Sequence, residues 1–230
     1  MGSSVLWRTI DTGEPVDFPQ VPWSMEVVGN FEAIEGTWHW EFSHNDLHQV
    51  NDSEIIRDHM FKAIYGSFYN AKKQPENKNL KLEWMSYLIG KRESRRIVGD
   101  YVYTFKDIKE IREFKDTIAM ETRAVDVHYQ QNIPDPSRPD FLSEALFYKI
   151  DRYYISYRCL YSKSVRNLFM AGRCISCSHV GLGGPRVMHT TGQMGVAVGY
   201  AAALCGKYDT DPRGGYINHI TELRNMIRGE

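Results

Sequence analysis

The sequence lacks an excess of one charge, a long apolar run, and any cysteine before residue 159. Its 28 Lys and Arg residues nearly balance 29 Asp and Glu residues, and the formal net charge of −1 excludes a nucleic-acid-binding module that relies on net charge. No stretch reaches the roughly 18 apolar residues of a membrane span. No basic segment precedes an apolar run at the N-terminus, so no signal peptide is expected. These absences predict a reduced, cytoplasmic protein that contacts neither membrane nor nucleic acid.

The chain does have enough apolar side chain to build a core. Hydrophobic residues make up 42% of its 230 residues, and a chain of this length folds as one or two domains. The proline-rich stretch 132–140 has the composition of a linker. We therefore expect two parts, residues 1–150 and residues 151–230.

Periodicity predicts both helices and strands, and so the α/β class. Ile56, Met60, Ile64 and Phe68 recur every four residues, which is typical of a helix, and this stripe ends before Pro75. Stretches rich in aromatic and β-branched residues are typical of strands. These stretches are 37–42, 80–88, 117–129 and 153–159.

The last eighty residues predict a succession of strand, glycine turn and helix. A short apolar strand at 167–172 stops at a glycine, and a glycine-rich turn follows at 181–186. A helix rich in Gly and Ala is predicted over 187–204, with Gly206 as its cap. A final amphipathic helix begins after Pro212.

The glycines in the helix at 187–204 need a physical reason. An interior glycine costs a helix about 1 kcal/mol relative to alanine, so Gly192, Gly195 and Gly199 indicate the close approach of another backbone or of a flat ligand. The start of the helix offers N–H groups and the positive end of its dipole to an anion, and Arg186 adds a charge. The alternative is tight helix–sheet packing with no ligand. Arg186 also stands where a dinucleotide fingerprint would have its third glycine, so we do not assign that fingerprint.

Three motifs, in this order along the chain, resemble markers of the FAD-dependent oxidoreductase family, whose FAD domain is of the glutathione-reductase and succinate-dehydrogenase type. The resemblance runs from about residue 38 to residue 206. The motifs lie at 90–101, at 157–162 and, for the C-terminal one, at 167–176, 178–179 and 186–188.

The resemblance implies a role for each part of the chain. Residues 1–150 would form a substrate or cap domain of mixed sheet and helices, and residues 151–230 would form the C-terminal part of an FAD-binding domain. Gly172 and Arg173 would lie beside the ribityl chain and pyrophosphate of FAD. Gly192 would let the following helix pack closely against the cofactor.

The start of that helix would face the flavin itself. Arg186, Val187 and Met188 would direct their N–H groups at the pyrimidine edge, where they stabilise negative charge on the reduced ring. The reaction implied is hydride transfer between a small organic substrate and FAD.

Residues 1–60 contain no strand followed by Gly-x-Gly-x-x-Gly, the unit that holds the ADP half of FAD in this family. We therefore expect the chain to represent the C-terminal portion of a flavin-dependent oxidoreductase and to bind FAD poorly alone. Full binding would need a nucleotide-binding half from a second chain or a second copy. The alternative hypothesis is a non-catalytic partner or interaction subunit that retains the flavoprotein scaffold.

His179, Arg158 and Tyr157 are the candidate catalytic residues. His179 lies just before the glycine turn, where it would act as a general base or orient an anionic substrate. Tyr157 and Arg158 would donate to a substrate oxygen. A structural histidine and packing at a strand edge are the alternative explanations.

The basic run contains Arg92, Arg95 and Arg96, the candidate substrate-binding residues. On a helix they would share one face and clamp a carboxylate or a phosphate. The alternative is a solvated face that pairs with Glu93 and Asp100.

Cys174 and Cys177 form a C-x-x-C, which near a flavin would suit a redox disulfide. The family resemblance makes this segment structural, so we predict two buried thiols instead. No second Cys/His pair has the spacing of metal ligands, and no metal site is expected.

Overall fold

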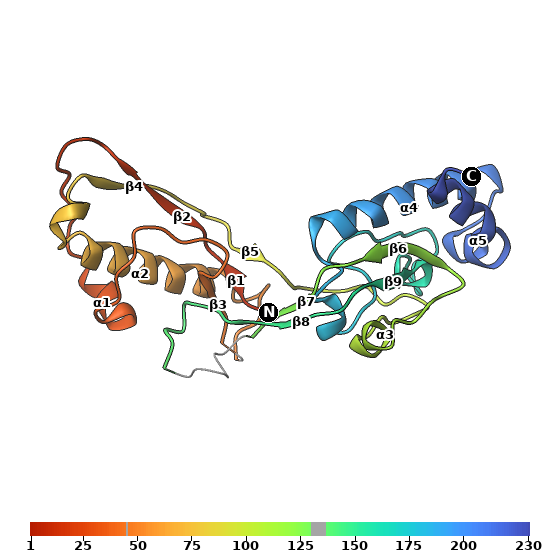
Figure 1. Ribbon diagram of the computed structural model, residues 1–230, viewed down its shortest axis with the longest axis horizontal. Coiled ribbons are helices and arrows are strands. Elements are labelled where there is room, and N and C mark those ends of the chain that lie inside the picture. Colours follow the sequence, from red (N-terminus) through yellow and green to blue (C-terminus); the bar gives the residue numbers. More distant parts are fainter. Residues whose placement is uncertain (45, 130–136) are drawn as a thin grey trace. The chain divides into compact units, whose positions relative to one another are not determined.

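The computed structural model describes residues 1–44, 46–129 and 137–230. These residues form two compact units (Figure 1). The first comprises Met1–Glu93 with His128–Ala145, and the second comprises Ser94–Val127 with Leu146–Glu230. Helices and small antiparallel sheets occur together, which confirms the predicted α/β class.

This division differs from a single break after residue 150. The chain passes between the units at 93/94, 127/128 and 145/146. The physical reason is strand pairing, because β6 (Thr117–Glu121) pairs antiparallel with β9 (Tyr153–Ser156) and so joins an early segment to the C-terminal part. The predicted linker at 132–140 is described only from residue 137, and its earlier residues lie outside the described part.

The first unit is built on a long helix, α2 (Ser53–Ala71), against which α1 (Pro22–Val28) packs. The predicted helical stripe is confirmed, since Ile56, Met60, Ile64 and Phe68 are fully buried. Two small sheets complete this unit. β2 (Trp7–Asp11) pairs antiparallel with β4 (Leu80–Met85), and β1 (Ser3–Ser4) lies between β3 (Glu41–Phe42) and β5 (Gly90–Lys91). A short 3₁₀ turn, Pro75–Asn77, precedes β4.

The second unit places α4 (Met188–Lys207) against β6 and against α5 (Pro212–Arg228) (Figure 1). Its other helix is α3 (Phe105–Lys109), and short 3₁₀ turns occur at Tyr157–Cys159 and Val180–Leu182. β7 (Val125–His128) pairs with β8 (Ala145–Tyr148), and the chain passes between the units within these two strands. The predicted helices at 187–204 and after Pro212 are thus confirmed.

Several predicted elements are shorter or different. The stretch 80–88 is a strand only at Leu80–Met85, and the stretch 117–129 is divided into β6 and β7. The stretch 37–42 is a strand only at Glu41–Phe42, because a turn with Trp40 N–H bonded to the Thr37 carbonyl precedes it. The predicted strand 153–159 ends at Ser156, where the Tyr157 N–H turns to the Asp116 carbonyl.

The C-terminal strand and cap also differ. Residues 167–172 form only one bridge, Tyr161 to Phe169, and lack a second neighbouring strand within the described residues. Gly206 lies inside α4, whose C-cap is Tyr208.

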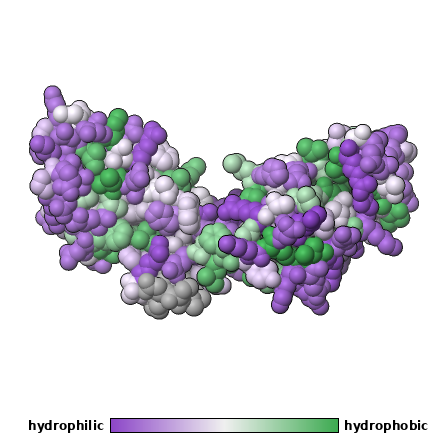
Figure 2. All heavy atoms as spheres, in the orientation of Figure 1, coloured by the Kyte–Doolittle hydropathy of each residue, from purple (hydrophilic) through white to green (hydrophobic). Residues whose placement is uncertain are grey.

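Hydrophilic side chains cover much of the visible surface of each unit, with smaller apolar patches between them (Figure 2). Within the described residues, no helix has the length and hydropathy needed to cross a membrane.

Candidate cofactor site at the start of helix α4

The start of α4 is open. Its N-cap residue, Val187, has extended backbone and no side-chain capping bond, and the side chain of Met188 is 89% exposed. The first N–H groups of a helix have no intrahelical acceptor and lie at the positive end of its dipole. This end of α4 therefore suits an anionic or electron-rich group.

A glycine loop lies against the same turn. Gly172 has φ +113°, a conformation that side chains disfavour, and a Cβ built on it would lie 3.9 Å from Cγ2 of Thr191 in α4. The structure thus brings Gly172 together with the start of α4, as the sequence predicts for two parts of one site. Arg173, next in the chain, is exposed and makes contacts of its own.

The glycines of α4 face open space. A Cβ at Gly192, Gly195 or Gly199 would meet no atom within 4 Å, although each glycine weakens the helix. Their spacing of three and four residues places them on one face. Packing within the described chain therefore does not explain them, and this face is free to receive a flat ligand or another backbone.

Arg186 is engaged by an acid of its own unit. Its guanidinium lies 3.1 Å from Oδ2 of Asp126 and donates to the Asp126 carbonyl at 3.2 Å. The two side chains are only 10% and 6% exposed. The positive charge of Arg186, which was expected to face the cofactor, is therefore neutralised by Asp126 of the same unit.

We expect Arg186→Gln to lower the free energy of unfolding by about 2 kcal/mol, because it removes the buried one of the two guanidinium groups that donate to the Asp126 carboxylate and leaves only the half-exposed Arg123. Urea unfolding followed by far-UV circular dichroism measures this. Arg123→Gln is the matched control, since Arg123 also contacts Asp126 Oδ2, at 3.2 Å, but is 49% exposed, and it should cost less than 1 kcal/mol. Equal stability of Arg186→Gln and the wild type would show that Arg186 does not hold Asp126.

A buried acid near the first turn of α4 was not anticipated from the sequence. Glu121 accepts hydrogen bonds from the N–H groups of Thr122 and Arg123, at 2.8 and 2.7 Å, and from the hydroxyl of Thr190 in α4. This carboxylate ties the end of β6 to α4 and so fixes the helix start. Thr190 and Glu121 are 69 residues apart, and no local pattern links them.

The candidate catalytic pair Tyr157 and Arg158 lies in a structural network. Arg158 binds both oxygens of the fully buried Asp116, with Nε–Oδ2 at 3.0 Å and a terminal nitrogen to Oδ1 at 3.1 Å. Tyr157 is fully buried and donates to the Pro212 carbonyl at 3.0 Å. Burial, followed by the neighbouring Cys205, raises the pKa of Tyr157 above its usual value, so the phenol stays protonated.

The remaining predicted residues are dispersed. His179 is exposed just before the 3₁₀ turn Val180–Leu182 and has contacts of its own. Arg92 belongs to the first unit, where its Nε lies 2.7 Å from Glu41 Oε2, whereas Arg95 and Arg96 belong to the second. No helix forms there, so the predicted single helical clamp does not exist in the described structure.

The cysteines are all free thiols. Cys177 is buried and Cys174 is half-buried. Across the described residues, no cluster of three or more His, Cys, Asp or Glu side chains could hold a metal ion.

The helix start without a side-chain cap and the Gly172 loop lie side by side, and N–H groups at such a place are suited to an anionic or electron-rich group. The family model for FAD dependent oxidoreductases matches residues 14–225. The match covers more than half of the chain, and the chain belongs to this family. Membership implies FAD as the cofactor. No curated protein and no solved structure gave a significant match.

The residues present fit FAD at this place. The uncovered glycine face at Gly192 and Gly195 leaves room for a flat ring, and the helix start supplies N–H donors for its electron-rich edge. Gly172 and Arg173 are the loop residues that would hold the ribityl chain and pyrophosphate. The fit involves backbone donors and open glycines, whereas Arg186 is occupied by Asp126.

Proposed function

We propose that the chain is the C-terminal portion of a flavin-dependent oxidoreductase that transfers hydride between a small organic substrate and FAD. The observation that carries this proposal is the uncapped, open start of α4 beside Gly172. FAD supplies the hydride-accepting and hydride-donating chemistry when bound. The chain's own part is to bind and orient it.

Each element has a defined task in this proposal. The first N–H groups of α4 stabilise negative charge on the ring, and each such interaction is worth about 0.3–1 kcal/mol in water and more where solvent is excluded. Glu121 and Thr190 hold the helix start in place. His179 is the exposed residue offered as a proton carrier or substrate anchor, since Tyr157 and Arg158 are engaged elsewhere.

The open face of α4 supports the proposal that a second chain or second copy completes the site. Its glycines cost helix stability and have no neighbour in the described chain, so contact with another backbone would explain them. The second candidate function is a non-catalytic partner subunit, which would use the same glycine face of α4 to contact another chain. This alternative predicts that no flavin binds at the start of α4.

We expect Gly192→Ala to raise the stability of the chain and to weaken FAD binding. The methyl group meets empty space in the chain itself, so unfolding should cost about 1 kcal/mol more. It would occupy the space taken by the ring, and the dissociation constant for FAD should rise about ten-fold. Thermal unfolding and titration with FAD, read by quenching of flavin fluorescence, measure the two effects.

Gly206→Ala is the control. Gly206 has the same empty surroundings but lies 14 residues after Gly192, which corresponds to about 21 Å along the helix. It should gain stability without any change in FAD affinity. FAD affinity unchanged by Gly192→Ala would remove the flavin from this face. Because the chain alone is expected to bind FAD weakly, the titration extends to millimolar FAD, and no binding even there would favour the non-catalytic subunit.

A further inference from the structure

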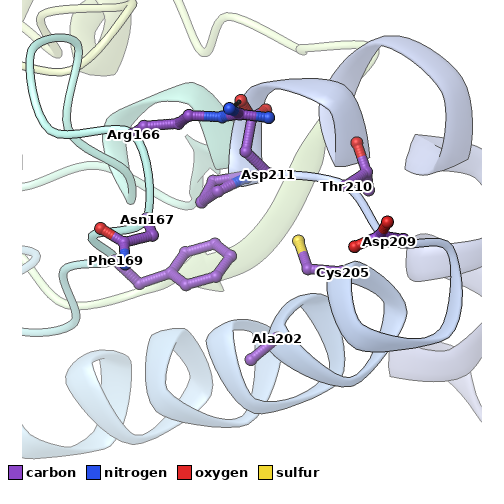
Figure 3. A pocket seen from close by; sticks show the side chains of 9 residues that line it. Arg166, Asn167, Phe169, Ala202, Cys205, Asp209, Thr210 and Asp211 are labelled. Carbon is purple, nitrogen blue, oxygen red and sulfur yellow. Dashed lines mark hydrogen bonds and ion pairs between the residues drawn. The ribbon is translucent and has the colours of Figure 1, made fainter.

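Two adjoining pockets lie in the second unit, away from the start of α4. The larger, of about 580 Å³, is an open pocket lined by the end of α4, the segment 166–169 and the turn before α5 (Figure 3). The smaller, of about 290 Å³, lies beside it, and the two share Arg166 and Asp211. Ala202 and Cys205 in the larger pocket are about 21 and 26 Å along α4 from Met188. This is a second site, distinct from the proposed flavin site.

The larger pocket suits a flat ring. Figure 3 shows the Phe169 ring and the Cys205 thiol directed into the same space, above Ala202 of α4. Phe169 and Ala202 provide apolar surface, and Asn167 and Thr210 provide hydrogen-bonding groups beside it. An aromatic ring stacks on a phenylalanine with a gain of about 0.5–1.5 kcal/mol beyond its buried area.

The smaller pocket has surplus positive charge. Its lining carries Lys163, Arg166 and Arg213 against one acid, Asp211. Arg213 is used by Asp100, to which it donates twice, at 2.7 and 2.6 Å. The other two cations are the ones with capacity left for a ligand.

Lys163 and Arg166 retain donors for an anion. Arg166 gives only its Nε–H to Asp211, at 3.0 Å, and its side chain is 84% exposed, so that pair is weak. Within the described residues, its terminal nitrogens and the Lys163 ammonium make no hydrogen bond or ion pair, and Lys163 acts on Asp100 only through its charge, which helps to lower the pKa of that carboxyl after the larger effect of Arg213. A phosphate between them would receive charge-assisted hydrogen bonds, which are stronger than neutral ones.

We propose that these pockets together bind an aromatic ring that carries a phosphate, with the ring on Phe169 and the phosphate between Lys163 and Arg166. The shared Arg166 links the two halves of the ligand. Both simple aryl phosphates and nucleoside monophosphates have this chemistry.

Calorimetric titration with phenyl phosphate, inorganic phosphate and phenol tests the proposal on the intact chain. Phenyl phosphate should bind more tightly than either half. It should also slow alkylation of Cys205, measured at pH 8 by peptide mass spectrometry, while labelling of Cys174 serves as the internal reference. Adenosine 5′-monophosphate binding more tightly than phenyl phosphate would indicate a nucleotide, and weaker binding a simple aryl phosphate.

Two variants separate the halves, one at the exposed Lys163 and one at the half-buried Phe169. Lys163→Gln should weaken phenyl phosphate and inorganic phosphate about five-fold each, whereas Lys109→Gln, an equal charge change at the end of α3, should alter neither. Phe169→Leu should weaken phenyl phosphate about five-fold and leave inorganic phosphate unchanged. Binding that survives both variants, or Cys205 labelling that no probe slows, would overturn the proposal.

Discussion

Replacing Asp116 by alanine is expected to lower the free energy of unfolding of the second unit by about 3–5 kcal/mol. Asp116 is fully buried and accepts from Ser156 Oγ at 2.6 Å, from the Arg158 N–H at 3.1 Å and from the Arg158 guanidinium. Alanine would leave all of these donors without their acceptor and would strand the Arg158 charge. The end of β9 and the turn that follows it depend on this one carboxylate.

Hydrogen exchange of peptides from β6 and β9 measures the effect in the correct unit, because all five tryptophans lie in the first unit and fluorescence would not report it. Asp151→Ala is the control: its pair with Arg152 is exposed, at 79% and 54%, and should contribute less than 1 kcal/mol. If Asp116→Ala exchanges as slowly as Asp151→Ala, Arg158 is not anchored by this pair and would again be available to a substrate.

The helices could be predicted from the sequence because their signal is local. The four-residue spacing from Ile56 to Phe68 reports which face is buried, and the chain needs no distant partner to show it. The Gly/Ala-rich stretch 187–204 likewise predicts a helix, and the structure has α4 at Met188–Lys207. The family resemblance implied that Gly172 lies near the start of α4, and the structure has Gly172 next to Thr191, whereas their common role in a cofactor site stays a prediction.

The partners of the charged residues could not be predicted in the same way. Arg158 meets Asp116, 42 residues earlier, and Arg92 meets Glu41, 51 residues earlier. The hydrophobic periodicity of a sequence does not indicate which distant residues form ion pairs. A run of arginines is therefore equally consistent with a ligand clamp and with internal ion pairs. The structure assigns Arg92, Arg158 and Arg186 to internal carboxylates.

Glu41 is a buried acid of the first unit, and its role there is similar to that of Asp116 in the second unit. Its Oε2 lies 2.7 Å from Arg92 Nε and 2.8 Å from His128 Nδ1, and the Glu41 and His128 side chains are each 1% exposed. Oε1 is buried and has no hydrogen-bond partner. Arg92 also donates to the Trp38 carbonyl and to Ser4 Oγ, so one carboxylate holds β1, β3 and the residues after β5 together.

Glu41→Gln is expected to lower the free energy of unfolding by about 3–5 kcal/mol at pH 7, because it removes the charge that Arg92 and His128 share. Burial acts to raise the pKa of Glu41, but hydrogen bonds and charge from His128 and Arg92 together outweigh it, and the pKa lies below its ordinary value of 4.5. A lowered pKa contributes stability above pH 4.5, and this contribution is lost as the pH falls through the folded-state value.

The difference in unfolding free energy between the wild type and Glu41→Gln should therefore be largest near neutral pH. It should decrease below pH 4.5, where the wild-type carboxyl takes up its proton. Urea unfolding at pH 7 and pH 3, followed by tryptophan fluorescence, reports this unit selectively because it contains every tryptophan. Glu35→Gln, at an exposed position of the same unit, should match the wild type at both pH values. If the difference in unfolding free energy is the same at both pH values, Glu41→Gln acts through altered packing. The ionised carboxylate would then not be what holds Arg92 and His128 in place.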